Sequence, residues 1–171
     1  MCHLCARVSS PPAAGREPLY LDDLHAGQRF TTVSHTVDEE EIREFALRFD
    51  PQPFHLDAEA ARVSLFAGLV ASGWHTAALT MRLQVESGPP LAGGIVGAGG
   101  RIDWPRPTRP GDTIRVESEV VKVRPSRTRP DRGIVTVLST TLNQRDEVVQ
   151  SLSADLVVPR RSPPARPAGA P

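Results

Sequence analysis

Asp50 and His55 are the residues of this 171-residue chain whose types and spacing best suit acid–base chemistry. They lie five positions apart in the run DPQPFH, where two prolines stiffen a short connection that we expect to be non-helical. A carboxylate and an imidazole that converge on one water molecule form an acid–base pair, because one group takes a proton while the other gives one. The spacing alone fits equally well a carboxylate at a helix end and a buried histidine bonded to the backbone.

The other four histidines have settings that suit structural or surface roles. His3 lies near the N-terminus, His25 and His35 flank the first expected strand, and His75 lies one turn into an expected helix. The settings of His3, His25 and His35 are those of ordinary surface histidines, which seldom have a functional role. His55 is therefore the stronger candidate.

A helix that ends at Asp50 positions the carboxylate. β-Branched residues predict a strand over 28–36, and the segment 36–39 offers a capping box that starts the helix. Apolar residues follow at helical spacing until Asp50, where Pro51 disfavours helix in the residue before it. Residues 57–62 predict one further short helical turn.

A longer helix is predicted over 73–87, with Ser72 as its N-cap. Its apolar residues lie on most of its sides, which is typical of a buried helix. The second half of the chain then changes to period two and predicts strands and turns. The strands are expected over 93–104, 113–123, 134–142 and 148–158, and the turns over 110–112 and 143–146. This order predicts an α+β fold in which an antiparallel sheet wraps a buried helix.

The composition is that of a domain without a charge bias. The chain carries 20 basic and 20 acidic side chains, so it has no basic surplus for nucleic acid or for an anionic membrane. No apolar run approaches the about 20 residues that span a bilayer, and the N-terminus lacks a secretory pattern, so we expect a cytoplasmic protein. Cys2 and Cys5 form a lone pair near the N-terminus, and we expect no metal site.

Both ends of the chain differ in composition from the middle. Residues 1–17 include a Pro/Ala/Ser-rich stretch and residues 160–171 are rich in Pro and Arg, so we expect two disordered tails. The remaining residues, 18–159, form one domain of about 140 residues, near the commonest domain size.

Residues 45–61 resemble the hydratase signature of the MaoC-like acyl dehydratase family, which includes (R)-specific enoyl-CoA hydratases. The matching positions are Asp50, His55 and the small residue Ala61, six places beyond the histidine. The resemblance continues through Ser72-Gly73, Trp104 to Pro107 and Arg109 to Asp112, and covers residues 20–159.

The resemblance implies a hotdog fold, which is a curled antiparallel sheet wrapped around a long central helix. It also implies substrates that are 2-enoyl or 3-hydroxyacyl thioesters, and it implies no cofactor. In hydration, Asp50 would take the proton of the reacting water, and His55 would position that water and protonate the α-carbon. Dehydration reverses both roles. The backbone N–H of Gly73 would donate to the thioester carbonyl, where the first turn of a helix offers unpaired N–H groups.

Three further residues are candidates for substrate binding. Gln52 stands where the family usually has Asn. Ser72 either binds substrate or caps the helix, and Trp104 either walls the acyl tunnel or belongs to the core. Two departures from the family pattern leave the acid–base pair intact: Phe54 replaces an aliphatic residue, and Met81 stands where the best-known hydratases carry a hydroxyl.

The resemblance also implies partners. The substrate carrier would be coenzyme A or acyl carrier protein, and a hotdog unit of this size implies a homodimer or a higher even oligomer. Arginines near the expected strand ends are candidates to bind the phosphates of the carrier. These are Arg101, Arg106, Arg109, Arg127 and Arg129.

Two alternatives to a hydratase remain open. A hotdog thioesterase would release free thiol. A non-catalytic acyl-thioester-binding protein, or an accessory subunit of a paired dehydratase, would bind acyl-CoA without converting it. The spacing of Asp50 and His55 favours the hydratase over both.

Overall fold

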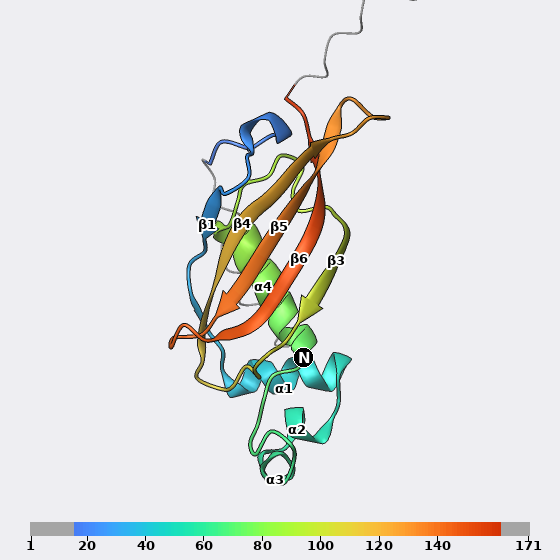
Figure 1. The fold of residues 1–171 in the computed structure, drawn as a ribbon. Coiled ribbons are helices and arrows are strands. Elements are labelled where there is room, and N and C mark those ends of the chain that lie inside the picture. Colours follow the sequence, from blue (N-terminus) through green and yellow to red (C-terminus); the bar gives the residue numbers. More distant parts are fainter. Residues whose placement is uncertain (1–15, 162–171) are drawn as a thin grey trace, which may run out of the picture.

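The long helix α4 (Gly73–Ser87) packs against one face of a curled antiparallel sheet (Figure 1). The computed structural model describes residues 16–161, so most of both predicted tails, with Cys2 and Cys5, lies outside the described residues. The arrangement confirms the predicted α+β class and the hotdog fold that the resemblance implies.

Three long strands form the middle of the sheet: β4 (Thr113–Pro125), β5 (Arg132–Leu142) and β6 (Val148–Pro159). The edge strand β3 (Gly97–Asp103) pairs with β6, which gives the order β1-β4-β5-β6-β3. Each of the three long strands spans the region predicted from its period-two pattern, because alternation of buried and exposed residues is a local property of a strand.

The predicted strand over 28–36 is wrong as a single element. The structure has two short strands, β1 (Arg29–Thr31) and β2 (His35–Thr36), which pair with different parts of β4. Thr32 lies between them and its hydroxyl accepts the backbone N–H of Val116 at 2.9 Å. The N–H of Val116 therefore donates to a side-chain oxygen instead of a backbone carbonyl, and the pairing with β4 is interrupted at Thr32.

The helix that ends at Asp50 is α1 (Glu39–Phe49). Its N-cap is Asp38, which forms a capping box with Glu41, so the predicted cap at 36–39 is displaced by two residues. Thr36 is unavailable as a cap because it belongs to β2 and bonds to Thr113 at 2.9 Å.

The connection between Asp50 and His55 is partly helical, which corrects the expectation of a non-helical segment. Pro53 begins the one-turn helix α2 (Pro53–Leu56), a position where the missing N–H of proline costs nothing. The next turn is α3 (Ala58–Arg62), the short helical turn predicted over 57–62, and the structure shows that Asp57 caps it.

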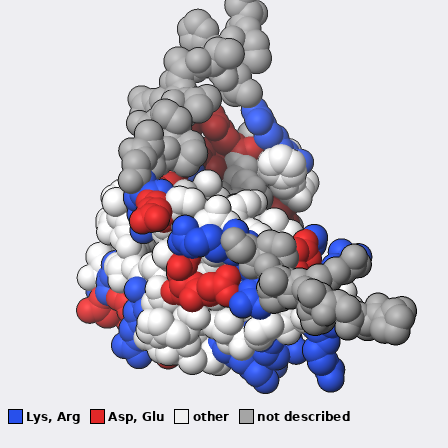
Figure 2. All heavy atoms as spheres, turned by 90° about the horizontal axis from the view of Figure 1, so that it is seen from above, with Lys and Arg blue, Asp and Glu red and all other residues white. Residues whose placement is uncertain are grey.

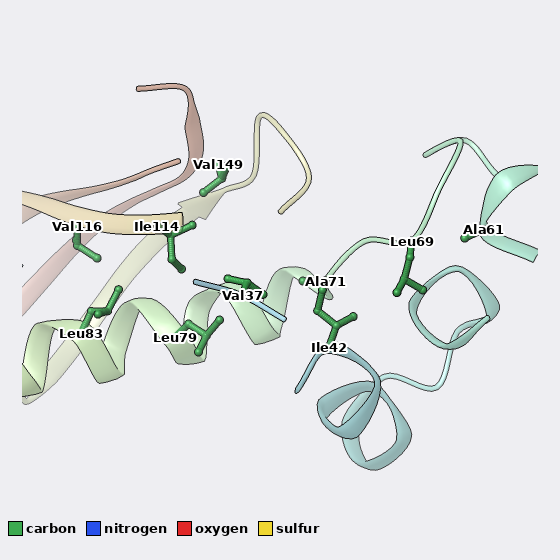
Figure 3. Close-up of a cluster of buried hydrophobic side chains, with 10 residues drawn as sticks. All are labelled: Val37, Ile42, Ala61, Leu69, Ala71, Leu79, Leu83, Ile114, Val116 and Val149. Atoms are coloured by element: carbon green, nitrogen blue, oxygen red, sulfur yellow. The ribbon is translucent and has the colours of Figure 1, made fainter. Parts of the chain in front are cut away.

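One buried cluster joins the sheet, α4 and the α1–α3 segment (Figure 3). Burial of side chains from all three regions holds the short helices against the start of α4. The cluster consists of Val37, Ile42, Ala61, Leu69, Ala71, Leu79, Leu83, Ile114, Val116 and Val149.

The composition of α4 predicts a helix that is buried on all sides, but the structure leaves one of its faces exposed. Trp74, Met81 and Val85 are exposed along one face. The face toward the sheet instead buries polar side chains with partners: Thr80 bonds to Thr141 at 2.7 Å, and Gln84 donates to Ser139 at 2.6 Å. These hydrogen bonds make the burial of polar atoms tolerable.

Basic and acidic side chains are intermixed on the face seen from above (Figure 2). Many arginines are paired, as in the contact of Arg160 with Asp22 at 2.6 Å. Within residues 16–161, no helix combines the length and hydrophobicity that crossing a membrane requires.

Candidate active site

Asp50 and His55 lie side by side where α1 passes into α2. Asp50 is the C-cap of α1, and its N–H donates to the carbonyl of Ala46 at 2.9 Å. Its Oδ2 lies 3.3 Å from Nε2 of His55. The prolines and the two helix ends therefore bring the two groups together, which is one of the two arrangements that the spacing fits.

The orientation of the His55 ring is determined by a backbone carbonyl. Nδ1 lies 2.8 Å from the carbonyl oxygen of Val70, which can only accept, so Nδ1 carries a proton. Nε2 is then the nitrogen that faces Asp50. The residue is buried, at 4% exposure, and the ring of Phe54 packs in an edge arrangement with the imidazole, with the ring centroids 4.5 Å apart.

Asp50 accepts two further hydrogen bonds. Ser72 Oγ donates to Oδ2 at 2.6 Å, and Gln52 Nε2 donates to Oδ1 at 2.7 Å. Burial raises the pKa of Asp50, but the hydrogen bonds from Ser72 and Gln52 and the proximity of His55 outweigh it, so the pKa lies below its ordinary value. Asp50 is therefore a carboxylate at neutral pH.

Ser72 serves both as a cap and as a partner of Asp50. Its Oγ accepts the N–H of Trp74 at 3.2 Å, which is the N-cap interaction that the sequence predicts. The same oxygen donates to Asp50, so the start of α4 is connected directly to the carboxylate.

Gly73, the first residue of α4, lies under the indole ring of Trp104. A Cβ placed on Gly73 would lie 2.9 Å from Cε2 of Trp104, closer than such contacts permit. The small residue is therefore needed for the tryptophan. Its N–H belongs to the first turn of α4, where no intrahelical acceptor exists.

The six candidate site residues all line one cavity of about 450 Å³. Trp104 is 38% exposed and forms part of this wall, so it is not a core residue. The six residues are Asp50, Gln52, His55, Ser72, Gly73 and Trp104.

The lining also includes residues that the sequence did not single out for the site. Phe66 follows α3, and Thr76 donates to Thr108 at 3.0 Å within the wall. Of the five arginines proposed for the carrier, Arg106 lines the cavity. Arg109 instead holds the loop after α3, because it donates to the carbonyl of Phe66 at 2.8 Å.

No group of three or more His, Cys, Asp or Glu side chains within the described range 16–161 is arranged to hold a metal ion. The site itself offers an ionised carboxylate on Asp50 and the imidazole of His55, two groups that can exchange protons with a molecule in the cavity.

Comparison with known proteins agrees with this architecture. An R-hydratase from Pseudomonas aeruginosa is 26% identical, with a TM-score of 0.69 over 84% of this chain and 88% of its own. A MaoC-like dehydratase from Rhodospirillum rubrum is 61% identical, with a TM-score of 0.83 over 84% of this chain and 99% of its own.

Sequence comparison gives the same family. An uncharacterised protein of Bacillus subtilis, YdeM, is 36% identical over 129 residues, which are 74% of this chain and 89% of the relative. A family model for the MaoC-like domain matches residues 23–143 and so includes every candidate site residue. The chain belongs to the MaoC-like dehydratase family.

Proposed function

We propose that this protein catalyses the reversible hydration of a 2-enoyl thioester to a 3-hydroxyacyl thioester. The observation that carries the proposal is the contact of Asp50 with His55 at 3.3 Å on the wall of the 450 Å³ cavity. Phe54, Phe66 and Trp104 supply apolar wall around this polar pair, which suits an acyl group. The R-hydratase and the MaoC-like dehydratase found by comparison support the reaction class.

In the hydration direction, Asp50 takes a proton from a water molecule whose oxygen bonds to C3 of the enoyl group. The π electrons of the double bond move toward the thioester carbonyl. His55, protonated on both nitrogens, gives the Nε2 proton to C2, and the hydroxyacyl product is complete. The proton on Asp50 then passes to Nε2 of His55 across 3.3 Å, which restores the starting pair.

The backbone N–H of Gly73 donates to the thioester oxygen, where negative charge grows in the transition state. The dipole of α4 places partial positive charge at the same helix end. Loss of one donor of this kind typically costs about 10²–10³ in rate.

Coenzyme A is the carrier that we propose for the acyl group. Arg106 lines the cavity and is the candidate to bind a carrier phosphate. Among residues 16–161 its ion-pair partner is Glu147, and this contact is long, with Nε of Arg106 3.9 Å from Oε1.

The working unit that we propose is a homodimer. Trp74 is 62% exposed, and Met81 and Val85 continue the same exposed face of α4. Strand β3 pairs on one side with β6 and is the last strand of the sheet in the part of the chain that the structure describes. An apolar helix face beside a free sheet edge is a surface that a second copy would cover.

The proposal is tested by the loss of the conjugated enoyl absorbance when the protein is mixed with enoyl-CoA thioesters of short, branched and long chains. Asp50→Asn and His55→Ala are each expected to lower kcat by about 10²–10⁴, because each removes one proton-transfer group. His25→Ala, which changes an exposed histidine outside the cavity, is the matched control and keeps wild-type activity.

Two other outcomes would contradict the proposal. Release of free thiol without loss of the double bond would indicate a thioesterase. Thermal stabilisation by acyl-CoA, with no turnover by wild type across the whole panel, would indicate a binding protein.

A further inference from the structure

Three contacts hold the indole of Trp104 in place. Its six-membered ring lies on Gly73, where an added Cβ would be 3.2 Å from Cζ2, and it forms an edge-to-face pair with Trp74, with the ring centroids 5.4 Å apart. Its Nε1 donates to Oε1 of Gln150 at 2.9 Å. The ring therefore has one defined place in the cavity wall, beside the first turn of α4.

Gln150 is an unusual residue for its place in the fold. It lies in β6 next to Val149, and both side chains are fully buried. Because the indole N–H can only donate, Oε1 must face Trp104, and this leaves Nε2 with no hydrogen-bond partner within the described residues. An apolar side chain of the same length would avoid that unpaired donor. Such a local conflict is expected where function requires the residue.

We propose that Gln150 is a positioning residue for the substrate cavity, acting through its hydrogen bond to Trp104. It fixes the indole on Gly73 before substrate arrives, so the wall beside the proposed carbonyl-binding N–H is already formed. The inference rests on the proposed hydratase function for its kinetic part only.

The expected effect is on substrate binding more than on proton transfer. Among the described residues, the side-chain polar partners of Asp50 and His55 include neither Gln150 nor Trp104. An indole that is fixed in advance has no freedom left to lose when substrate binds, whereas a loose ring must be ordered at that step. Removal of the acceptor therefore raises KM, while kcat changes much less.

The first measurement is the indole N–H resonance of Trp104 in the ¹H–¹⁵N NMR spectrum. The chain has two tryptophans, so Trp74→Phe assigns the Trp104 signal. Gln150→Met keeps the length of the side chain and removes the acceptor. It is expected to move the signal upfield and to speed its exchange with solvent. Gln150→Glu retains an acceptor oxygen and restores slow exchange.

Gln84→Met is the matched control for this measurement. Gln84 is the other buried glutamine of the sheet–helix interface, and its amide donates to Ser118 and Ser139 instead of contacting Trp104. Its replacement loses a buried amide yet leaves the Trp104 signal in place. An unmoved signal in Gln150→Met, or an equal shift in Gln84→Met, would overturn the proposal.

The second measurement is a double-mutant cycle on enoyl-CoA hydration. Gln150→Met is expected to raise KM about three- to tenfold, the range that one neutral hydrogen bond supports. In a Trp104→Phe background, which lacks the N–H donor, the same change adds nothing. A KM effect of equal size in both backgrounds would show that Gln150 acts without Trp104.

The two measurements separate the failure of this inference from that of the hydratase proposal. If wild type hydrates no enoyl thioester, the proposed function fails, and the NMR result still decides whether Gln150 holds the indole. If turnover occurs and the resonance shifts while KM stays constant, the hydratase stands and the positioning role is wrong.

Discussion

The carboxylate of Asp50 shows how neighbouring donors determine the protonation state of a single residue. Partial burial opposes ionisation, but Ser72 and Gln52 each donate to a different carboxylate oxygen. Hydrogen bonds donated to a carboxylate are stronger when it is ionised, so these two bonds favour the charged form of Asp50. Asp50 therefore begins the proposed hydration as a base.

Removal of either donor is expected to shift the acid limb of the pH profile. Ser72→Ala and Gln52→Leu each raise the pKa of Asp50, so kcat/KM falls at a higher pH than in wild type. Ser72→Ala also removes the N-cap hydrogen bond of α4 and costs about 1 kcal/mol of stability, whereas the exposed side chain of Gln52 makes no cap hydrogen bond to α2. A shared shift in both variants thus isolates the effect on Asp50. Unchanged acid limbs in both would contradict the role of the two donors.

The same pKa predicts how acid affects stability. Because the pKa of Asp50 is lower in the folded protein than the about 3.9 of an unfolded aspartate, its ionisation stabilises the fold above that pH. The contribution is lost as pH falls through the folded pKa. This contribution to stability is smaller in Ser72→Ala, because the folded and unfolded pKa values of Asp50 are closer together in that variant.

At the scale of elements, the start of α4 is where helix, loop and sheet meet. Ser72 caps the helix and bonds to Asp50, while Gly73 accommodates the ring of Trp104 from the segment after β3. The helix terminus therefore contacts both sides of the cavity. A glycine is required here by a close approach, not by its backbone conformation.

Gly73→Ala is expected to destabilise the protein by about 1–3 kcal/mol, the usual range for overpacking. An alanine at a helix start would otherwise be neutral or favourable, so the loss comes from the collision with Trp104. Urea unfolding measures the change. Gly97→Ala in β3, where a Cβ meets nothing within 4 Å, is expected to stay within about 0.5 kcal/mol of wild type. Equal stability of wild type and Gly73→Ala would show that the indole moves aside freely.

At the scale of the whole molecule, one side of α4 has no covering layer among residues 16–161. The sheet and the short helices enclose the opposite side, yet Trp74, Met81 and Val85 remain exposed. Trp74 also contacts Trp104, so this uncovered face adjoins the wall of the cavity. A second copy on this face would lie next to the candidate site.

Sedimentation velocity at micromolar concentration is expected to show a dimer for wild type. The double variant Met81→Glu, Val85→Glu is expected to sediment as a monomer, because it would bury two carboxylates without partners in the interface. Val121→Glu, a change at an exposed apolar residue of β4, is the control and remains dimeric. A double variant that stays dimeric would place the interface elsewhere. A monomeric wild type would exclude the proposed dimer.

The sequence by itself determined the elements whose signals are local. The periodicity of α1 and α4, the proline after Asp50 and the alternation in β4, β5 and β6 lie within the elements they predict. The motif around Asp50 and His55 also indicated the two residues of the proposed acid–base pair, since both lie within one short segment.

The tertiary structure alone decided the contacts between distant segments. His55 meets the carbonyl of Val70 and Trp104 meets Gln150, across 15 and 46 positions of the chain. The exposed face of α4 is likewise a result of packing, because composition cannot say which apolar side the sheet covers. Local patterns record backbone preference and hydrophobicity, whereas these contacts depend on how the sheet curls around the helix.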